Sequence, residues 1–340
     1  MKLIYFSAMS VPNCRLGVLI PRNKKLKIKL PSRILPQCAS QGIEVVDIDD
    51  EEQLYTNGPY DVLLHKITDY HNELSHVEAC AKMERIHDYC SKQTDMVLLD
   101  PFEGSEMLTD RFQQTKLMKS CQFELDGIKV FLPKSVEIGA DSTSEGASEL
   151  ISSLGMKFPL LVKPGIASIT ETSHDMRLVF CSEHLRDLIL PCVAQEFCNH
   201  SGIVYKIYII GERIFLFERP SIRDVDCASR ESLYFDTREI SKLGKSYNPE
   251  LHGEDPNART WLSCAEKPDL LNGKVVAELS RRVQEATKLQ LLGIDVLVES
   301  ATGNYALIDV NQFPGYSGIR EEHFCEAFVD LIKSCGGRKC

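Results

Sequence analysis

The stretch "ALIDVNQFPGYSGI" (306–319) joins an apolar strand pattern to a glycine-containing turn, and it carries Asp309 and Asn311 among residues that favour a dry interior. A charge or an amide in such a strand costs free energy unless something binds it. The segments "GIDVLVES" (293–300) and "YALIDVN" (305–311) are joined by "ATGN", which is the length of a short hairpin loop. The function of the chain therefore depends on what the polar face of this hairpin binds.

Pairing Glu299 with Tyr305 sets Asp295 directly opposite Asp309. Because strand side chains alternate with period two, Asp295, Asp309 and Asn311 then share one face. The apolar residues predicted for the other face are Val296, Val298, Ala306, Ile308 and Val310. Two carboxylates about 5 Å apart repel each other unless one is protonated, a lysine intervenes or a divalent cation bridges them. Two carboxylates and an amide form a ligand set that suits a Mg²⁺ ion that also binds nucleotide phosphates. The alternative is an exposed acidic hairpin that binds no ligand.

Size, charge and cysteine usage limit the possible classes of protein. At 340 residues the chain favours two or three sub-domains over one core. The formal net charge of −10 argues against nucleic acid as a general partner, and no apolar run reaches the roughly 20 residues of a membrane span. We read no secretory signal at the start of the chain. The 13 cysteines include no C-x-x-C pair, which predicts reduced thiols in a cytosolic or nuclear protein; we expect a cytoplasmic monomer.

Two local patterns have both a plain and a functional interpretation. His71 and His76 have the spacing of a zinc-finger histidine pair, but no cysteine pair precedes them, so we interpret them as part of a solvated helix face. The run "PRNKKLKIK" (21–29) holds five basic residues and no acid. It is either a solvated face or a local anion site.

Alternating strands and helices fill the first hundred residues, which predicts a small parallel-sheet α/β unit. The β-rich runs are 15–20, 42–49, 60–67 and 94–101. Later segments predict a hairpin over 204–221 with its turn at Gly211-Glu212, a helix over 105–121, and a helix over 271–292 that ends at Gly293. The segment 222–270 has little periodicity, and we expect a long loop with short elements.

Phosphate binding in this chain needs a design other than the common glycine-rich loops. Gly244-Lys245-Ser246 resembles the end of a P-loop, but Glu239 stands where its first glycine belongs, and there is no G-x-G-x-x-G. Lys163 ends the apolar strand "FPLLVK" before a loop of small residues, where a lysine can cover a triphosphate. Lys206 lies inside the apolar strand "VYKIYII" and needs an anion to offset its desolvation.

Residues 15–330 resemble the inositol-tetrakisphosphate 1-kinase (inositol 1,3,4-trisphosphate 5/6-kinase) family of the ATP-grasp superfamily. The resemblance is carried by "GIDVLV…YALIDVNQFPGY", "HKITD" (65–69), "SHDM" (173–176), "QEFCNHSGIVYKIYIIGE" (195–212) and "RPSIRD" (219–224). It implies an α/β ATP-grasp fold in which an N-terminal parallel-sheet domain (1–104) precedes two α+β sub-domains (105–194 and 195–335) that clasp ATP. It also implies transfer of the γ-phosphoryl group of ATP to a hydroxyl of an inositol tris- or tetrakisphosphate.

The resemblance assigns a role to each matching position. Asp295 would hold one Mg²⁺, Asp309 would bridge two, and Asn311 would bind the second ion and touch the substrate. The positions implied for nucleotide contacts are Arg111, Lys163, Gln195, Ser221, Thr237 and Ser241. The positions implied for inositol phosphate contacts are Lys25, with Lys24 as the alternative, Lys66, His174 and Lys206. Lys163, His174 and Asp309 would take part in catalysis.

The sequence departs from the family pattern at two places, and two other functions remain as alternatives. The family carries serine where Thr237 stands, and His-Gly or Asp-Gly where this chain has Ser168-Ile169, which restricts the loop. An ATP-grasp ligase that joins a carboxylate to an amine would share the hairpin and Lys163 but would not need the lysine run or Lys66. A protein that binds ATP or inositol phosphate without catalysis is the second alternative.

Overall fold

The computed structural model describes residues 14–28, 30–167, 171–225, 231–240 and 270–336. The chain divides into two compact units: unit 1 is Met1–Asp100 with Arg320–Cys340, and unit 2 is Pro101–Ile319. In these described ranges, no helix combines the length and the apolar character needed to cross a membrane.

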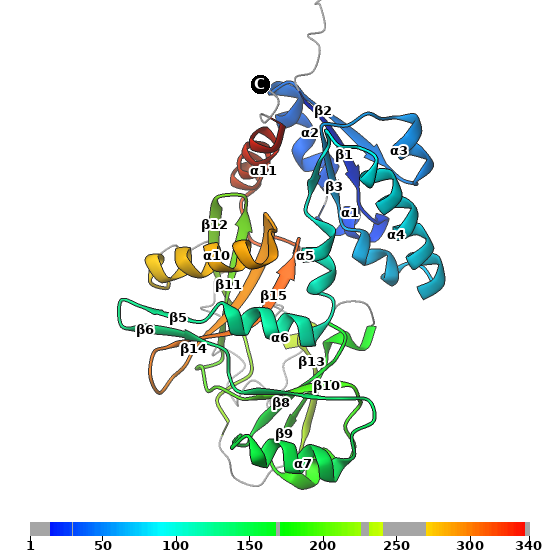
Figure 1. Cartoon of the computed structure of the whole chain (residues 1–340). Coiled ribbons are helices and arrows are strands. Elements are labelled where there is room, and N and C mark those ends of the chain that lie inside the picture. The colour runs from blue at the N-terminus through cyan, green and yellow to red at the C-terminus, as the bar shows by residue number, and fades with distance from the viewer. Residues whose placement is uncertain (1–13, 29, 168–170, 226–230, 241–269, 337–340) are drawn as a thin grey trace, which may run out of the picture. The chain divides into compact units, whose positions relative to one another are not determined.

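Unit 1 is built on a four-stranded parallel sheet with the strand order β2-β1-β3-β4 (Figure 1). All four strands coincide with the β-rich runs predicted from the sequence. Their bounds are β1 Cys14–Leu19, β2 Ile43–Ile48, β3 Val62–His65 and β4 Val97–Leu99. Central strand β3 is buried along its whole length, as expected of a parallel strand that is covered on both faces.

Helices surround this sheet and include one from the far end of the chain. Helix α11 (Glu321–Gly336) packs against α2, β1 and β3, and its apolar side is buried. The other helices of unit 1 are α1 Arg22–Ile28, α2 Leu30–Ser40, α3 Glu52–Thr56, the 3₁₀ helix η1 Ile67–Asn72 and α4 His76–Ser91. Residues of α1 and η1 line one pocket of this unit.

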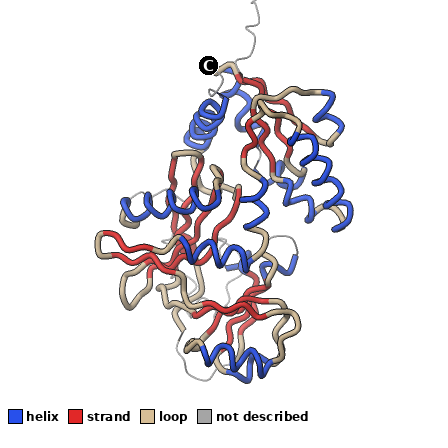
Figure 2. Tube along the Cα trace, in the orientation of Figure 1, coloured by secondary structure: helices blue, strands red, loops and turns tan. Residues whose placement is uncertain are grey.

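Unit 2 contains two sheets, which Figure 2 shows as separate groups of strands. The six-stranded sheet has the order β12-β11-β14-β15-β6-β5 and is antiparallel except where β15 meets β6. Its strands are β5 Phe123–Leu125, β6 Ile128–Phe131, β11 Ile203–Ile210, β12 Arg213–Pro220, β14 Leu291–Val298 and β15 Tyr305–Gln312. The turn between β11 and β12 is Gly211-Glu212 with Gly211 at φ 60°, so the predicted hairpin is confirmed.

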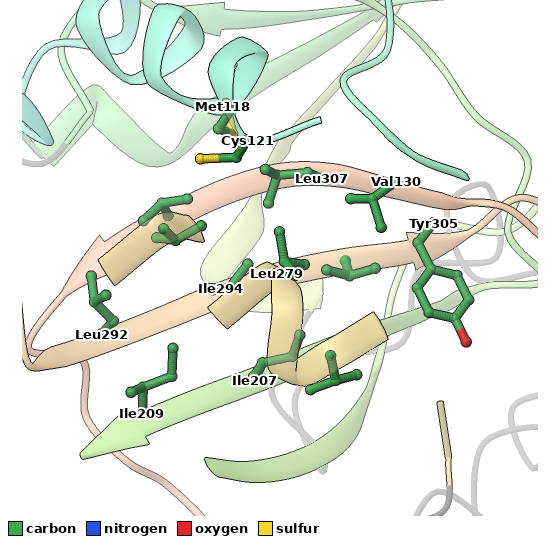
Figure 3. Packing of buried hydrophobic residues seen from close by; sticks show 14 of the residues in the cluster. Met118, Cys121, Val130, Ile207, Ile209, Leu279, Leu292, Ile294, Tyr305 and Leu307 are labelled. Carbon is green, nitrogen blue, oxygen red and sulfur yellow. The ribbon is translucent and has the colours of Figure 1, made fainter. Parts of the chain in front are cut away.

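The main core of unit 2 lies between one face of this sheet and helices α6 (Arg111–Ser120) and α10 (Gly273–Thr287). Figure 3 shows Ile207, Ile294 and Leu307 from three adjacent strands beside Leu279 of α10 and Met118 of α6. These residues alternate along each strand with residues on the opposite face. The polar residues of the sheet therefore lie on the face away from the helices.

The second sheet of unit 2 has the order β13-β9-β8-β10-β7, and every pair in it is antiparallel. Its strands are β7 Ser135–Ile138, β8 Leu160–Pro164, β9 Asp175–Val179, β10 Cys192–Glu196 and β13 Leu233–Asp236. The accompanying helices are α7 Ser144–Ser153, η2 Glu171–His174, η3 Ser182–Leu185 and α8 Thr237–Ile240. Helix α5 Phe102–Met107 packs instead against α10. The core of the second sheet includes Ala147 and Ile151 of α7 against Val162 and Ala194.

Two helix predictions were wrong at their boundaries. The helix expected over 105–121 is divided into α5 and α6, because Asp110 caps α6 by accepting hydrogen bonds from the backbone of Phe112 and Gln113. The helix expected over 271–292 ends earlier, with Lys288 in the left-handed conformation at φ 61°. Gly293 lies within β14, where an added Cβ would come within 3.0 Å of Pro314. Most of the loop expected over 222–270 is outside the described residues.

Candidate active site

The acidic pair lies on adjacent strands of the six-stranded sheet. Asp295 of β14 is the direct register partner of Asp309 of β15, as predicted. The predicted pairing of Glu299 with Tyr305 was wrong, because Tyr305 pairs with Val298. A β-bulge at Ile308 makes up the difference of one residue, since Ile308 has no partner on β14.

The bulge also changes which apolar residues share a face. Val296 and Val310 belong to the main core under α6 and α10, whereas Ala306 and Ile308 pack in a smaller cluster with Leu297. The single even-numbered face predicted from the sequence was therefore wrong for part of β15. An extra residue in a strand reverses the alternation of side chains from that point onward.

Lys206 occupies the position beside the acidic pair on β11. It is the register partner of Asp295, and its Nζ lies 2.6 Å from Asp295 Oδ2. Burial alone would lower the pKa of Lys206, but the attraction of Asp295 raises it above its ordinary value. Burial raises the pKa of Asp295 in spite of Lys206, and the charge of Asp309 adds to that rise. In the protein without ligands, this lysine supplies the positive charge that the acidic pair requires.

Asp309 has a different electrostatic setting from its partner. Burial would raise the pKa of Asp309, but the cations of Arg111 and Lys163 hold it below its ordinary value. Arg111 Nη1 lies 3.9 Å from Asp309 Oδ1, and Asn311 Nδ2 donates to Asp309 Oδ2 at 2.9 Å. That hydrogen bond leaves the amide oxygen of Asn311 as the group suited to a cation. The three oxygen donors fit the ligand preference of Mg²⁺.

Lys163 links the two sheets of unit 2. Its side chain is buried, and its Nζ donates to the backbone oxygen of Ile308 at 3.1 Å. This oxygen belongs to the bulge residue that has no partner on β14. Burial, assisted by the charge of Arg111, lowers the pKa of Lys163 to about 8. The ammonium is thus held at an acidic site. Because its pKa is lowered, a bound anionic ligand would stabilise its charged form.

Arg111 is placed by the break between α5 and α6. The backbone N–H of Arg111 donates to the oxygen of Gly165, and Asp110 forms an isolated β-bridge with Ile166. The guanidinium donates to the oxygen of Ser173 at 3.1 Å, while its Nε is buried without a hydrogen-bond partner among the described residues. A continuous helix over 105–121 would not expose the backbone groups that anchor this segment to the loop after β8.

Gln114 is a site-supporting residue that sequence reasoning missed. It is buried on α6, one turn after the helix N-terminus, and its Nε2 donates to the backbone oxygen of Val310 at 2.7 Å. This bond fixes α6 against β15 beside Asp309. The amide in the buried face of the helix was the available signal, because a buried amide needs a partner.

The remaining positions implied for the nucleotide are spread over several elements of unit 2. Gln195 is buried on β10 and donates to Ser135 Oγ at 3.1 Å. Ser221 Oγ lies 2.7 Å from His200 Nε2, and Thr237 Oγ1 lies 3.2 Å from His174 Nδ1. The last contact joins a position implied for nucleotide to one implied for substrate. Ser241 and the Ser168-Ile169 segment lie outside the described residues.

Unit 1 contains Lys24, Lys25 and Lys66, three of the lysines considered for the inositol phosphate. Lys25 is buried, and its Nζ pairs with Asp47 and with Asp49 and donates to the oxygen of Ile48 at 3.0 Å. Lys66 is also buried, and its Nζ lies 3.7 Å from Asp69 Oδ1. Burial lowers the pKa of Lys66. The structure thus gives Lys25 a network of acids within its own unit.

Lys24 points to a different environment from its neighbour Lys25. It lines a pocket of ≈ 190 Å³ together with Pro21, Asn23, Lys27, Asp69, Asn72 and Glu73. Burial, followed by the charges of Lys66 and Lys27, lowers the pKa of Lys24 to about 7. Lysines that lower one another's pKa values repel each other, and a bound polyanion would relieve that repulsion. Such a group of lysines therefore favours the binding of a polyanion.

Comparison with protein families identifies two matching domains. The inositol 1,3,4-trisphosphate 5/6-kinase pre-ATP-grasp domain matches residues 17–104, and the ATP-grasp domain of the same name matches residues 126–334. The chain is similar to the inositol-tetrakisphosphate 1-kinase of Danio rerio, with 29% identity over 96% of this chain and 81% of that protein. It is 30% identical to inositol-tetrakisphosphate 1-kinase 2 of Oryza sativa subsp. indica, over 93% of this chain and 85% of that protein.

Solved structures show the fold. A Chryseobacterium gregarium ATP-grasp ligase in complex with ADP and a peptide matches with a TM-score of 0.60 at 12% identity, over 94% of this chain and 97% of that one. The D-alanine–D-alanine ligase of Bacillus anthracis matches with a TM-score of 0.54 at 14% identity, over 96% of this chain and 99% of that one. The expected ATP-grasp fold is therefore confirmed, and at this identity the likeness says nothing about the reaction.

Proposed function

This chain belongs to the inositol 1,3,4-trisphosphate 5/6-kinase family, and from that premise we propose which of its residues carry the reaction. The protein is an inositol phosphate kinase that uses ATP, as its inositol-tetrakisphosphate 1-kinase relatives in animals and plants indicate. The ligases that share the fold are too distant to favour the carboxylate–amine reaction. The acceptor is therefore a hydroxyl of an inositol polyphosphate.

We propose that Asp295, Asp309 and Asn311 hold Mg²⁺, with two ions as expected from the family. The observation that carries this proposal is the direct pairing of Asp295 with Asp309 beside Lys206. The all-oxygen donor set supports Mg²⁺ over softer metals. When bound, the metal neutralises charge on the β- and γ-phosphates of ATP and favours in-line attack on the γ-phosphorus.

The cations of unit 2 prepare the site for the triphosphate. Lys163 is held in place by the oxygen of Ile308, and Arg111 by that of Ser173, so both bring positive charge toward Asp309 without needing to reorganise. Gln195, Ser221, Thr237 and Ser241 would contact the nucleotide. The nucleophile is the substrate hydroxyl, and no phosphoenzyme is needed because the transfer is direct.

Positive charge would bind the phosphates of the inositol substrate. Lys206 and His174 of unit 2, and Lys66 of unit 1, keep the substrate role implied by the family. For the lysine run, the acids around Lys25 support a role in folding, and the pocket position of Lys24 supports the substrate role. An acidic protein can bind a polyphosphate only by gathering positive charge locally.

The reaction is tested by incubating the purified chain with γ-labelled ATP, Mg²⁺ and a panel of inositol tris- and tetrakisphosphates. The expected result is label in a more highly phosphorylated inositol, separated by ion-exchange chromatography. A ligase would instead release phosphate only with an amino acid pair and leave the inositols unchanged. Tight binding of both ligands without turnover would indicate a non-catalytic binding protein.

We also propose that the chain acts as a monomer in the cytoplasm. None of the described cysteines is in a disulfide, which fits a reducing compartment. Light scattering on the eluate of a sizing column measures the mass in solution. A mass of twice 38.3 kDa would contradict the monomer.

A further inference from the structure

Three possible metal ligands converge on the surface of unit 1. They are His71 at the end of η1, His76 at the start of α4 and Cys80 one turn further along α4. Their ligand atoms all lie within 4.8 Å of one another. The sequence pattern showed the two histidines but gave no cysteine pair, so the third ligand was not expected. We propose that His71, His76 and Cys80 form a binding site for a transition-metal ion, with Zn²⁺ as the best fit.

The distances are close to those of a tetrahedral zinc site. Cys80 Sγ lies 3.7 Å from His76 Nε2 and 3.9 Å from Nδ1. With Zn–N near 2.0 Å and Zn–S near 2.3 Å, ligand atoms in a tetrahedral site lie roughly 3.5 Å apart. The rings of His71 and His76 are stacked with centroids 5.3 Å apart. The proposed site requires the stacked rings to rotate so that all three donor atoms face one ion.

Local structure fixes the spacing of the three ligands. His76 and Cys80 are four residues apart on one helix, so their side chains lie on the same face. Ser75 caps α4 in a reciprocal arrangement with Glu78, which defines where the helix begins. On the other side, buried Tyr70 anchors the end of η1, and its backbone oxygen accepts from Leu74 at 2.9 Å. The segment between the histidines is thus held by hydrogen bonds at both ends.

The chemistry of the donor set distinguishes this site from the proposed Mg²⁺ site. His71 Nδ1 is buried and has no hydrogen-bond partner among the described residues, so it is a polar atom that a metal would satisfy. Two imidazoles and a thiolate favour Zn²⁺, whereas Mg²⁺ prefers oxygen donors. Three protein ligands leave a fourth position for water. This arrangement does not depend on the kinase reaction.

The site is tested on the full, reduced chain by titration with Zn²⁺ against a chromophoric chelator, and with Co²⁺ alone. We expect one ion to bind, with a near-ultraviolet thiolate-to-cobalt charge-transfer band. The Cys80→Ser substitution should abolish the band, and His76→Ala should weaken Zn²⁺ binding at least tenfold. Cys90→Ser on the same helix is the matched control and should retain both properties. Circular dichroism confirms that each variant is folded.

Alkylation gives a second readout that does not require a variant. Zn²⁺ should slow the reaction of Cys80 with iodoacetamide, measured by mass spectrometry on the peptide that contains it, and Mg²⁺ should not. Equal Zn²⁺ affinity in the wild type, Cys80→Ser and His76→Ala would overturn the proposal. So would an unchanged rate of alkylation, which would leave the contact between Cys80 and His76 as a thiol–imidazole hydrogen bond only.

Discussion

Lys206 and Asp295 face each other across β11 and β14, and their side chains form an ion pair of 2.6 Å directly beside Asp309. The lysine therefore offsets the repulsion of two facing carboxylates in the protein without ligands. The ion pair thereby couples the lysine proposed to bind substrate to an acid proposed to bind metal. If Mg²⁺ were bound by Asp295, as proposed, Lys206 would be released to pair with the phosphates of the substrate.

Replacing Lys206 with methionine should destabilise the metal-free protein. Removal of one partner from a buried pair leaves an uncompensated charge, and we expect a loss of about 3 kcal/mol in the free energy of unfolding. Calorimetry should show a lower Tm and a larger rise on addition of Mg²⁺ and ADP than in the wild type. The double variant with Asp295→Asn should regain part of the lost stability. An unchanged Tm would show that the pair is not required.

Replacing Asp309 with asparagine should abolish transfer and leave the fold intact. The substitution removes a metal-binding charge but keeps the size of the side chain, and it also removes repulsion of Asp295. We expect kcat to fall by at least about 10²-fold, in keeping with the loss of electrostatic stabilisation of the transition state. Product formation with labelled ATP measures the effect, with the Tm as a check of folding. Normal turnover at ordinary Mg²⁺ concentrations would contradict the metal assignment.

Deletion of Ile308 should preserve the pairing of β15 with β14 but remove the contact of β15 with Lys163. Without the bulge residue the strand pairing becomes regular, and Leu307, Asp309 and Val310 keep their present register partners on β14. The protein should fold, but Lys163 should lose the backbone oxygen that holds it. Because a hydrogen bond to a charged group contributes about 1.5–3 kcal/mol, we expect ATP affinity to fall about tenfold or more. Isothermal titration measures it, and unchanged affinity would show that the bulge does not position Lys163.

The two adjacent lysines of α1 should give different phenotypes. Lys25→Met should lower the free energy of unfolding by about 1–2 kcal/mol, because it removes a buried donor from Ile48 and the acids around it. Lys24→Met should leave stability nearly unchanged and weaken inositol phosphate binding. Thermal unfolding and titration calorimetry on both variants make the comparison. The reverse pattern would return the substrate role to Lys25.

The pKa of Lys24, lowered to about 7, also predicts a pH dependence of binding. In the free protein Lys24 loses its proton as the pH rises through 7, and a bound polyanion raises that pKa again. Binding should therefore take up a proton at pH 8, and the affinity should fall as the pH rises from 6 to 8. Calorimetry in buffers with different ionisation enthalpies measures the uptake. Lys24→Met should remove it, and uptake that persists in this variant would assign it to another group.

The alternation of apolar and polar residues was enough to predict from the sequence that two adjacent strands form a hairpin carrying Asp295 and Asp309. Local periodicity also gave the four parallel strands of unit 1 and the turn at Gly211-Glu212, because these depend on neighbouring residues in the chain. The pairing of Asp295 with Asp309 was also predicted, although from a register at Glu299 and Tyr305 that the bulge at Ile308 makes wrong by one residue. The residue types Lys163 and Lys206 indicated buried cations, since a lysine in an apolar strand requires a partner.

The tertiary structure decided what those residues contact. The bulge at Ile308, the break before Arg111 and the bond from Gln114 to Val310 depend on elements that are distant in the sequence. The difference between Lys24 and Lys25 depends on the acids of β2 and η1, and the approach of Cys80 to two histidines depends on where α4 begins. Periodicity assigns a residue to a face of its own element, whereas long-range packing determines which charge or ligand atom it meets there.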